Sequence, residues 1–192
     1  MNRKEELLQK ISDLFAKQGY EKTSIRDIAA HLGMTNAGLY YYFKNKQQML
    51  VDIMQHGMDE ALSTMRKELP RMKSGEERIE FIVRCQVTFY ANHKSQTRAA
   101  IREMGTRLDA KHAKAIDRKH QEYVGFVRQA IEQVIQENPY ITIKPTIATF
   151  CLLGMLNWLV DWYDPEGEVS PDEITSNITG IFLVGLKGKA AK

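Results

Sequence analysis

Short polar side chains and tyrosines lie close together early in the chain, in a pattern that suits contact with nucleic acid. Thr35, Asn36 and Gly38 begin a short segment of helical periodicity. Tyr40 and Tyr41 follow within the same segment. Hydroxyl and amide groups of this size can reach base edges, whereas tyrosine hydroxyls can reach phosphates. Neighbouring residues on a helix are about 100° apart, so consecutive tyrosines cannot share one face and one of them must point outward.

The elements that position these residues form a helix, a turn and a second helix. Residues 24–32 and 35–43 both have the apolar spacing of short helices. Gly33 between them can adopt the positive φ of a tight turn, and Ala29 is small enough for the two helices to approach closely. Leu39 can pack back onto the first helix. This arrangement predicts a helix-turn-helix whose second helix can enter the major groove of DNA.

Core packing is the other interpretation of the aromatic run. Tyr42 and Phe43 fit it, because they fall on the side of Leu39 or at the end of the helix. An outward tyrosine next to Lys44 and Lys46 fits contact with a phosphate backbone better. We therefore expect Tyr42 and Phe43 inside, and at least one of the other tyrosines outside.

The charge distribution is consistent with an anionic partner at one end of the molecule. Residues 1–50 carry eight Lys and Arg against five Asp and Glu, which accounts for the whole net charge of +3. Nucleic acid is the commonest partner of such a surface, and no basic amphipathic helix favours a membrane. A mildly basic, solvated face is the other interpretation, and charge by itself does not separate the two.

The rest of the chain also has helical periodicity, which predicts an all-α protein of about nine helices. We expect a three-helix headpiece over residues 1–46, followed by a larger helical bundle over residues 47–192. The expected helices after the headpiece run from residue 47 to just before Pro70, and over 74–93, 95–108, 109–137, 145–162 and 170–187.

Several classes of protein are disfavoured by the composition and spacing. Cys85 and Cys151 lie far apart in apolar helical patterns, which favours a reducing cytoplasm over a disulfide scaffold. The longest nearly unbroken apolar stretch, residues 147–160, is shorter than the roughly 20 residues that span a bilayer. The segment 33–38 lacks the Lys and the preceding strand of a phosphate-binding loop, and the five histidines form no metal-binding pair. We expect a cytoplasmic protein with no catalytic residues, no metal and no cofactor.

The headpiece resembles the DNA-binding segment of TetR-family transcriptional regulators. The resemblance lies in residues 23–29 (TSIRDIA), 33–35 (GMT) and 39–46 (LYYYFKNK). It implies a homodimeric regulator, by family habit a repressor, that binds a palindromic DNA operator and is released by a small effector in the larger domain. The implied DNA-binding residues are Thr23, Ser24, Thr35, Asn36, Gly38, Tyr40, Tyr41 and Lys46.

The resemblance also implies a role for each position. Thr23 and Ser24 would touch phosphate from the second helix, and Lys46 would anchor phosphate at the start of the fourth. Thr35, Asn36 and Gly38 would face the groove, and Tyr40 and Tyr41 would meet the backbone or a base. The family commonly has histidine where Tyr41 stands, so the operator sequence is not implied. A helical protein–protein adaptor is the alternative class, and its binding would lack the steep salt dependence of phosphate contacts.

The middle and last helices carry features that predict a small-molecule effector. Residues 154–174 resemble the C-terminal region of TetR-type regulators of fatty-acid and other acyl-CoA catabolism, which implies a fatty acyl-CoA or another hydrophobic small molecule as the effector. The candidate ligand-binding residues are apolar or aromatic, and most positions of this kind belong to a core. They are Phe81, Cys85, Phe89, Met104, Leu108, Tyr123, Phe126, Phe150 and Met155.

The final two helices are apolar over a wider arc than a surface helix needs. This width predicts a four-helix interface between two copies of the chain, related by a two-fold axis. Burial in the core of a single chain is the other interpretation of the same pattern.

Overall fold

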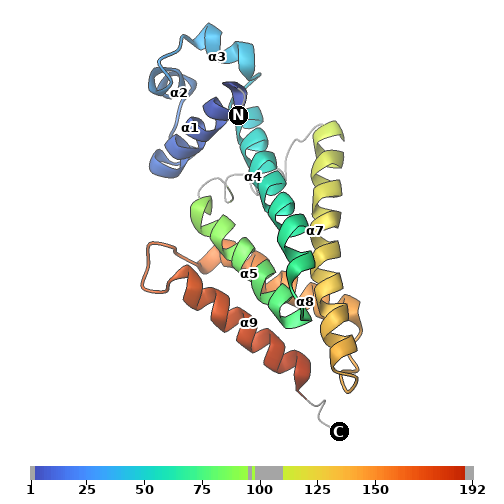
Figure 1. Cartoon of the computed structure of the whole chain (residues 1–192). Coiled ribbons are helices and arrows are strands. Elements are labelled where there is room, and N and C mark those ends of the chain that lie inside the picture. Colours follow the sequence, from blue (N-terminus) through green and yellow to red (C-terminus); the bar gives the residue numbers. More distant parts are fainter. Residues whose placement is uncertain (1–2, 95–96, 98–109, 189–192) are drawn as a thin grey trace. The chain divides into compact units, whose positions relative to one another are not determined.

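The structure is a computed structural model that describes residues 3–94, 97 and 110–188. Within these residues the protein has eight α-helices, one short 3-10 helix and no strand, which confirms the predicted all-α class (Figure 1). The helix expected over residues 95–108 lies outside the described residues apart from Thr97. The helices are α1 (Arg3–Gln18), α2 (Ile25–His31), α3 (Asn36–Tyr42), α4 (Lys46–Glu68), α5 (Gly75–Asn92), α7 (Ala110–Glu137), α8 (Pro145–Trp162) and α9 (Pro171–Lys187), with a 3-10 turn at Leu69–Arg71.

The chain divides into two compact units. Unit 1 comprises residues 1–59 and 93–114, and unit 2 comprises residues 60–92 and 115–192. Helix α4 begins in unit 1 and ends in unit 2. The sequence predicted a different kind of division, between a DNA-binding part that ends at residue 46 and an effector-binding part that follows it. That functional division stays a prediction.

Local sequence signals set the boundaries of the headpiece helices. Gly19 follows α1 with φ 83° and Gly33 follows α2 with φ 64°, both in the left-handed region that favours glycine. Ser24 caps α2 and Thr35 caps α3, because each side-chain oxygen accepts a hydrogen bond from the backbone N–H three residues later. These turns and caps confirm the expected helix, turn, helix arrangement.

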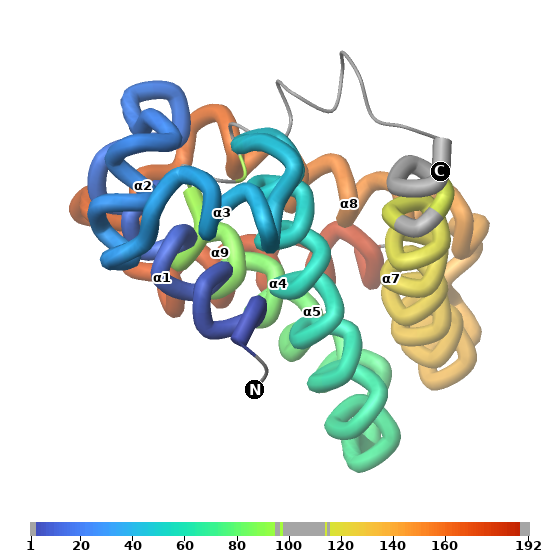
Figure 2. Tube along the Cα trace, turned by 90° about the horizontal axis from the view of Figure 1, so that it is seen from above, coloured from blue at the N-terminus to red at the C-terminus, as the bar shows by residue number. Residues whose placement is uncertain are grey.

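The apolar faces of α1, α2, α3 and the beginning of α4 meet in one core. Figures 1 and 2 show α1, α2 and α3 gathered around the first turns of α4. Leu39 on α3 is fully buried in the same cluster as Ile28 on α2, as expected. Other large buried side chains of this core are Leu7, Ile11, Phe15, Phe43, Met49 and Leu50.

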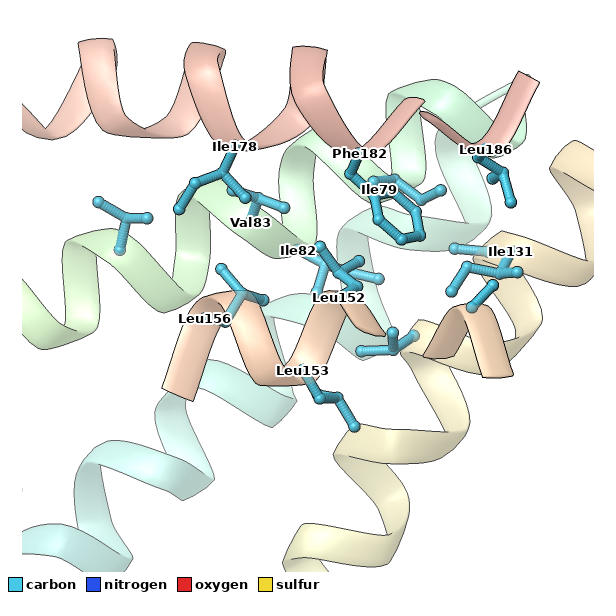
Figure 3. Packing of buried hydrophobic residues seen from close by; sticks show 14 of the residues in the cluster. Ile79, Ile82, Val83, Ile131, Leu152, Leu153, Leu156, Ile178, Phe182 and Leu186 are labelled. Carbon is cyan, nitrogen blue, oxygen red and sulfur yellow. The ribbon is translucent and has the colours of Figure 1, made fainter. Parts of the chain in front are cut away.

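Unit 2 has its own core, built mainly by α5, α7, α8 and α9. Helices α5 and α9 pack most extensively, and ion pairs bracket their antiparallel contact. Arg84 and Asp172 are 2.5 Å apart at one end, and Lys187 pairs with Glu76 at the other. Figure 3 shows the buried side chains that interdigitate here, among them Ile79, Ile82, Val83, Ile131, Leu152, Leu153, Leu156, Ile178, Phe182 and Leu186.

The first turn of α5 is pressed against the last turns of α7. A Cβ atom on Gly75 would lie 2.5 Å from the backbone nitrogen of Val134 and 2.8 Å from the carbonyl oxygen of Ala130. The N–H of Gly75 donates to the carboxylate of Glu137 at 3.1 Å. A side chain at residue 75 would therefore force the two helices apart.

None of the helices in the described part of the chain is both long and apolar enough to cross a membrane.

Candidate nucleic-acid interface and ligand-facing residues

The outer surface of α3 carries the side chains that sequence analysis assigned to DNA. Thr35 and Asn36 are exposed at its first turn, and the hydroxyl oxygen of Thr35 accepts a hydrogen bond from the Gly38 N–H at 3.1 Å. A Cβ on Gly38 would make only ordinary contacts, at 3.4 Å and beyond. Packing does not require glycine there. Its effect is that no side chain projects from this part of the helix surface, so the helix backbone can come close to the floor of a groove.

The tyrosine run divides between the surface and the core. Tyr41 is 84% exposed and Tyr40 is 52% exposed, whereas Phe43 is 1% exposed. Tyr42 is half-buried, and its ring meets the Tyr41 ring edge-on at 5.1 Å between centroids. The expectation that Tyr42 and Phe43 turn inward and another tyrosine outward therefore holds. The Tyr42 ring also supports the exposed Tyr41 from one side.

Thr23 and Ser24 are both engaged within the headpiece. Thr23 is buried, with its hydroxyl donating to the Gly19 carbonyl at 2.7 Å, so its side chain does not reach the surface as the resemblance implied. Ser24 is exposed, and its hydroxyl donates to the Asp27 carboxylate at 2.7 Å. The bonds from the Ser24 hydroxyl and backbone N–H lower the pKa of Asp27. We therefore leave Thr23 out of the interface and keep Ser24 at its edge.

Lys46 has an internal role that the sequence did not indicate. Its ammonium group donates to the carbonyl oxygens of Tyr20 at 3.0 Å and Thr23 at 3.1 Å, and it lies 4.2 Å from the centroid of the Tyr20 ring. Lys46 thereby ties the first turn of α4 to the turn between α1 and α2. An ammonium group has three N–H donors, so one is left for a phosphate oxygen.

A second lysine also joins the headpiece helices. Lys4 on α1 pairs with Asp52 on α4 at 2.6 Å and lies 5.5 Å from the centroid of the Phe43 ring. Asp52 also accepts a hydrogen bond from the Gln48 side chain at 2.7 Å. Part of the excess positive charge of residues 1–50 is therefore neutralised by an ion pair within the protein.

Several candidate ligand-binding residues meet in unit 2. Phe81, Cys85 and Phe89 recur every four residues along α5, so they form one stripe beside its core face, and all three are half-buried. Tyr123 and Phe126 on α7 are also half-buried. All of these except Phe89, together with Met155 on α8, pack against the core of unit 2 while keeping part of their surface accessible.

The remaining candidates do not belong to this group. Phe150 is 60% exposed on α8 and does not belong to the half-buried group, so its role in ligand binding stays a prediction. Met104 and Leu108 lie outside the described residues. No cluster of His, Cys, Asp or Glu suited to a metal is found in the part of the chain that the structure describes.

Burial raises the pKa values of two groups in this set. It raises the pKa of the Cys85 thiol to about 11, although the positive charge of Arg84 offsets part of the effect. Burial also raises the pKa of Tyr123, and the adjacent Cys85 adds to the increase. Tyr123 is half-buried as a residue, but its hydroxyl oxygen is buried. At neutral pH both groups are uncharged.

Helices α8 and α9 expose large apolar side chains that the core of unit 2 does not cover. On α8, Trp158 is 65% exposed and Trp162 is 54% exposed. On α9, Ile181 is 66% and Val184 73% exposed. Ile147 and Phe150 extend the exposed apolar surface of α8. We call these six residues the α8–α9 face.

Two family models match the chain. Residues 4–53 match the model described as bacterial regulatory proteins of the tetR family. Residues 72–186 match the model described as the C-terminal domain of tetracyclin repressor-like proteins. The second match alone covers more than half of the chain, and the first contains the whole helix-turn-helix.

Individual relatives agree with these matches. The chain is 25% identical over 191 residues to the transcriptional repressor KstR2 of Rhodococcus jostii, covering 96% of this chain and 91% of the relative. It is 29% identical to AibR in a crystal structure with isovaleryl coenzyme A and operator DNA, with a TM-score of 0.73 and coverage of 94% and 97%. FadR of Bacillus subtilis, solved with stearoyl-CoA, shares the fold at 14% identity, with a TM-score of 0.74 and coverage of 94% and 98%.

Proposed function

The chain belongs to the TetR family of bacterial regulatory proteins, and from this premise we propose that it is a homodimeric repressor that binds a palindromic operator and is released by a hydrophobic effector. The family consists of transcriptional regulators, which confirms the expectation that the chain is not an enzyme. One observation carries the proposal: α3 exposes Tyr40 and Tyr41 beside the polar first turn at Thr35 and Asn36. A helix with this surface is suited to a major groove.

Each exposed group on α3 has a suitable partner in DNA. The Asn36 amide can bond two atoms of an adenine edge, and the Thr35 side chain can reach a base or a phosphate. Tyr40 and Tyr41 extend far enough to contact the phosphate backbone or a base methyl group. Tyr41 is the strongest candidate for a contact with DNA, because a tyrosine that is 84% exposed has little role in folding.

The test is the selection of bound sequences from a random pool of double-stranded DNA, with wild type and Tyr41→Ala in parallel. We expect an enriched palindrome for the wild type. Tyr41→Ala should weaken its binding by about 1–3 kcal/mol, because one contact in each headpiece is lost. Tyr140→Ala is the control, since Tyr140 is 57% exposed outside the headpiece. Unchanged affinity in folded Tyr41→Ala would remove this residue from the interface, and no enrichment from folded dimer would contradict operator binding.

The α8–α9 face supports the dimeric part of the proposal. Water-exposed tryptophans and isoleucines gathered on two adjacent helices favour contact with another apolar surface. A palindromic operator requires two headpieces related by a two-fold axis, and such an axis brings the same face of each chain together. A second copy of this chain is therefore the partner we propose.

Two observations support a hydrophobic effector. The half-buried side chains of α5 and α7 offer an apolar surface that the core of unit 2 does not fully cover. The solved structure of AibR, similar along nearly all of its length, contains isovaleryl coenzyme A. We propose an acyl-CoA or a similar molecule as the effector, bound by Phe81, Cys85, Phe89, Tyr123, Phe126 and Met155.

A further inference from the structure

The hydroxyl group of Tyr123 is buried and has no hydrogen-bond partner among the described residues. A buried hydroxyl without a partner has lost its hydrogen bonds to water and gained none in return. Burial also keeps the phenol protonated, because it raises the pKa of Tyr123. At neutral pH the group is therefore a protonated hydrogen-bond donor that no described residue uses.

Tyr123 on α7 and Cys85 on α5 pack against the same core of unit 2. The two helices are antiparallel and touch where Gly75 meets Val134. Cys85 acts electrostatically on the Tyr123 hydroxyl, so the two side chains are near each other. Figure 1 shows the helices close at the start of α5 and further apart towards its end.

Two other tyrosines show why Tyr123 differs from a packed core residue. Tyr90 is buried and its hydroxyl donates to the Val160 carbonyl at 2.9 Å, as buried tyrosines usually do. The Tyr163 hydroxyl is also buried and has no partner in the part of the chain that the structure describes, but the whole residue is only 1% exposed. Tyr123 combines a buried hydroxyl that no described residue bonds with a side chain that is only half-buried.

The candidate ligand-binding residues described on α5 and α7 are apolar or neutral. Phe81, Cys85 and Phe126 are half-buried on the same two helices, and the Cys85 thiol is neutral at physiological pH because burial raises its pKa to about 11. A ligand that fits here must be largely apolar. It must also carry a hydrogen-bond acceptor for the Tyr123 hydroxyl, and this acceptor need not be charged.

We propose that Tyr123 donates a hydrogen bond to a carbonyl oxygen of the effector, whose apolar part lies against the stripe of Phe81, Cys85 and Phe89. This inference rests on the proposed function, because it specifies the chemistry of the same effector. A thioester carbonyl of an acyl-CoA and a ketone of a steroid offer the same acceptor. Both sources are represented among similar proteins, by AibR with isovaleryl coenzyme A and by the ketosteroid regulator KstR2 of Mycobacterium tuberculosis.

The experiment compares matched ligands that differ in the carbonyl oxygen alone. The pairs are isovaleryl-CoA with its S-isopentyl thioether, stearoyl-CoA with its S-octadecyl thioether, and a 17-ketosteroid with the corresponding deoxo steroid. Binding to the full-length protein is measured by calorimetry without DNA. We expect the wild type to bind the carbonyl member of at least one pair about tenfold more tightly, and Tyr123→Phe to bind both members of that pair equally. Tenfold corresponds to about 1.4 kcal/mol, as one hydrogen bond to a ligand would give.

Two variants separate this role from a structural one. Tyr123→Phe should melt at the same temperature as the wild type or higher, because it removes a buried group without a partner. Tyr90→Phe should melt at a lower temperature, because it loses the bond to Val160, and it should keep the carbonyl preference. A clear fall in the melting temperature of Tyr123→Phe would indicate a structural partner and overturn the proposal.

The ligand results also separate this proposal from the proposed function. Equal binding of both members by the wild type, or a preference that persists in Tyr123→Phe, overturns the role of Tyr123 while leaving effector binding intact. If no member of any pair binds, the proposed effector class fails and the role of Tyr123 fails with it. Because the measurement needs no DNA, a failure of operator binding does not affect it. The pair that shows the preference identifies thioester or ketone as the source of the carbonyl.

Discussion

At the scale of single residues, the features that the sequence predicted are those set by near neighbours. The positive φ of Gly33 and the cap at Thr35 depend on residues within one turn, so their types are sufficient to place them. The bonds from Lys46 to Tyr20 and Thr23 join residues 26 and 23 positions apart, and no local pattern indicates them. Only the folded headpiece brings these groups together.

Lys46→Met should therefore affect folding as well as DNA binding. It removes two hydrogen bonds from a charged donor while keeping the aliphatic part of the side chain, and we expect it to lower the free energy of unfolding by roughly 1–3 kcal/mol. Thermal and urea unfolding measure this change. If the third N–H contacts phosphate, the variant also lowers the salt dependence of operator binding by about one unit per contact in each chain.

Lys44→Ala is the matched control for this prediction. Lys44 is exposed at the turn just before α4, so its loss removes a nearby positive charge without touching the Tyr20 and Thr23 carbonyls. Its stability should stay within about 0.5 kcal/mol of the wild type. A Lys46→Met protein as stable as Lys44→Ala would contradict the internal role of Lys46.

The raised pKa of Cys85 gives a pH-dependent prediction. The thiolate is the reactive form, and with a pKa of about 11 its fraction rises nearly tenfold for each pH unit between 7.5 and 9.5. In a Cys151→Ser protein, the rate of Cys85 alkylation by iodoacetamide should rise in the same proportion without levelling off. Peptide mass spectrometry measures the rate. A plateau near pH 9 would mean that burial does not perturb this thiol, and slower alkylation with bound effector would place ligand beside it.

At the scale of elements, α8 illustrates why the sequence left two interpretations open. The helix is apolar on nearly all sides, because one side is buried through Leu152 and Leu156 while the other exposes Trp158 and Trp162. Periodicity reveals a narrow apolar stripe, but it cannot divide a helix that has two apolar sides between two partners. The structure assigns one side to the core of unit 2 and leaves the other available for a second chain.

Trp158→Glu and Ile181→Glu should each weaken the dimer without unfolding the chain. Both side chains are about two-thirds exposed in one chain, so a carboxylate there stays solvated in the monomer. In a symmetric dimer each change occurs twice and would bury charge, so we expect dissociation constants at least about 100-fold higher. Analytical ultracentrifugation measures this shift.

Tyr140→Glu is the control for the dimer, because Tyr140 is an exposed aromatic residue outside α8 and α9. It should leave the dissociation constant unchanged. A wild type that is monomeric at micromolar concentration would contradict the proposed dimer. If both α8–α9 variants dimerise as the wild type does, another surface must form the dimer. Loss of helical circular dichroism in these variants would instead favour the buried-core interpretation.

At the scale of the whole molecule, α4 connects the regions assigned to DNA and to the effector. It starts at Lys46 in the headpiece and continues to Glu68 in unit 2. Near its end, the Arg66 guanidinium makes two hydrogen bonds to the Glu122 carboxylate, at 2.6 and 2.8 Å, and lowers the pKa of Glu122. Glu122 precedes Tyr123, so this ion pair ties α4 to the part of α7 that we expect to contact the effector.

Breaking this pair should reduce the coupling between effector and operator more than it reduces either binding. The pair is partly exposed, with 55% of the Arg66 side chain and 34% of the Glu122 side chain accessible, so its contribution to stability should not exceed about 1 kcal/mol. Linkage requires that the effector weakens operator binding by the same factor as the operator weakens effector binding. That factor should fall several-fold in Arg66→Gln and in Glu122→Gln, and no further in the double variant if the two residues act as a pair.

The measurement is effector titration by calorimetry with and without a saturating operator fragment, for the wild type and the three variants. Arg71→Gln is the control. Arg71 lies in the 3-10 turn just after α4 and pairs with Glu68, and it makes no bond to the described residues of α7. A coupling factor unchanged in Arg66→Gln would show that the signal does not pass through this ion pair. Equal losses in Arg66→Gln and Arg71→Gln would show that charge near the end of α4 matters rather than this contact. A loss confined to the Arg66 and Glu122 variants would identify the α4–α7 contact as the link, since the helix that it holds begins at Lys46, in the region that we propose to bind the operator.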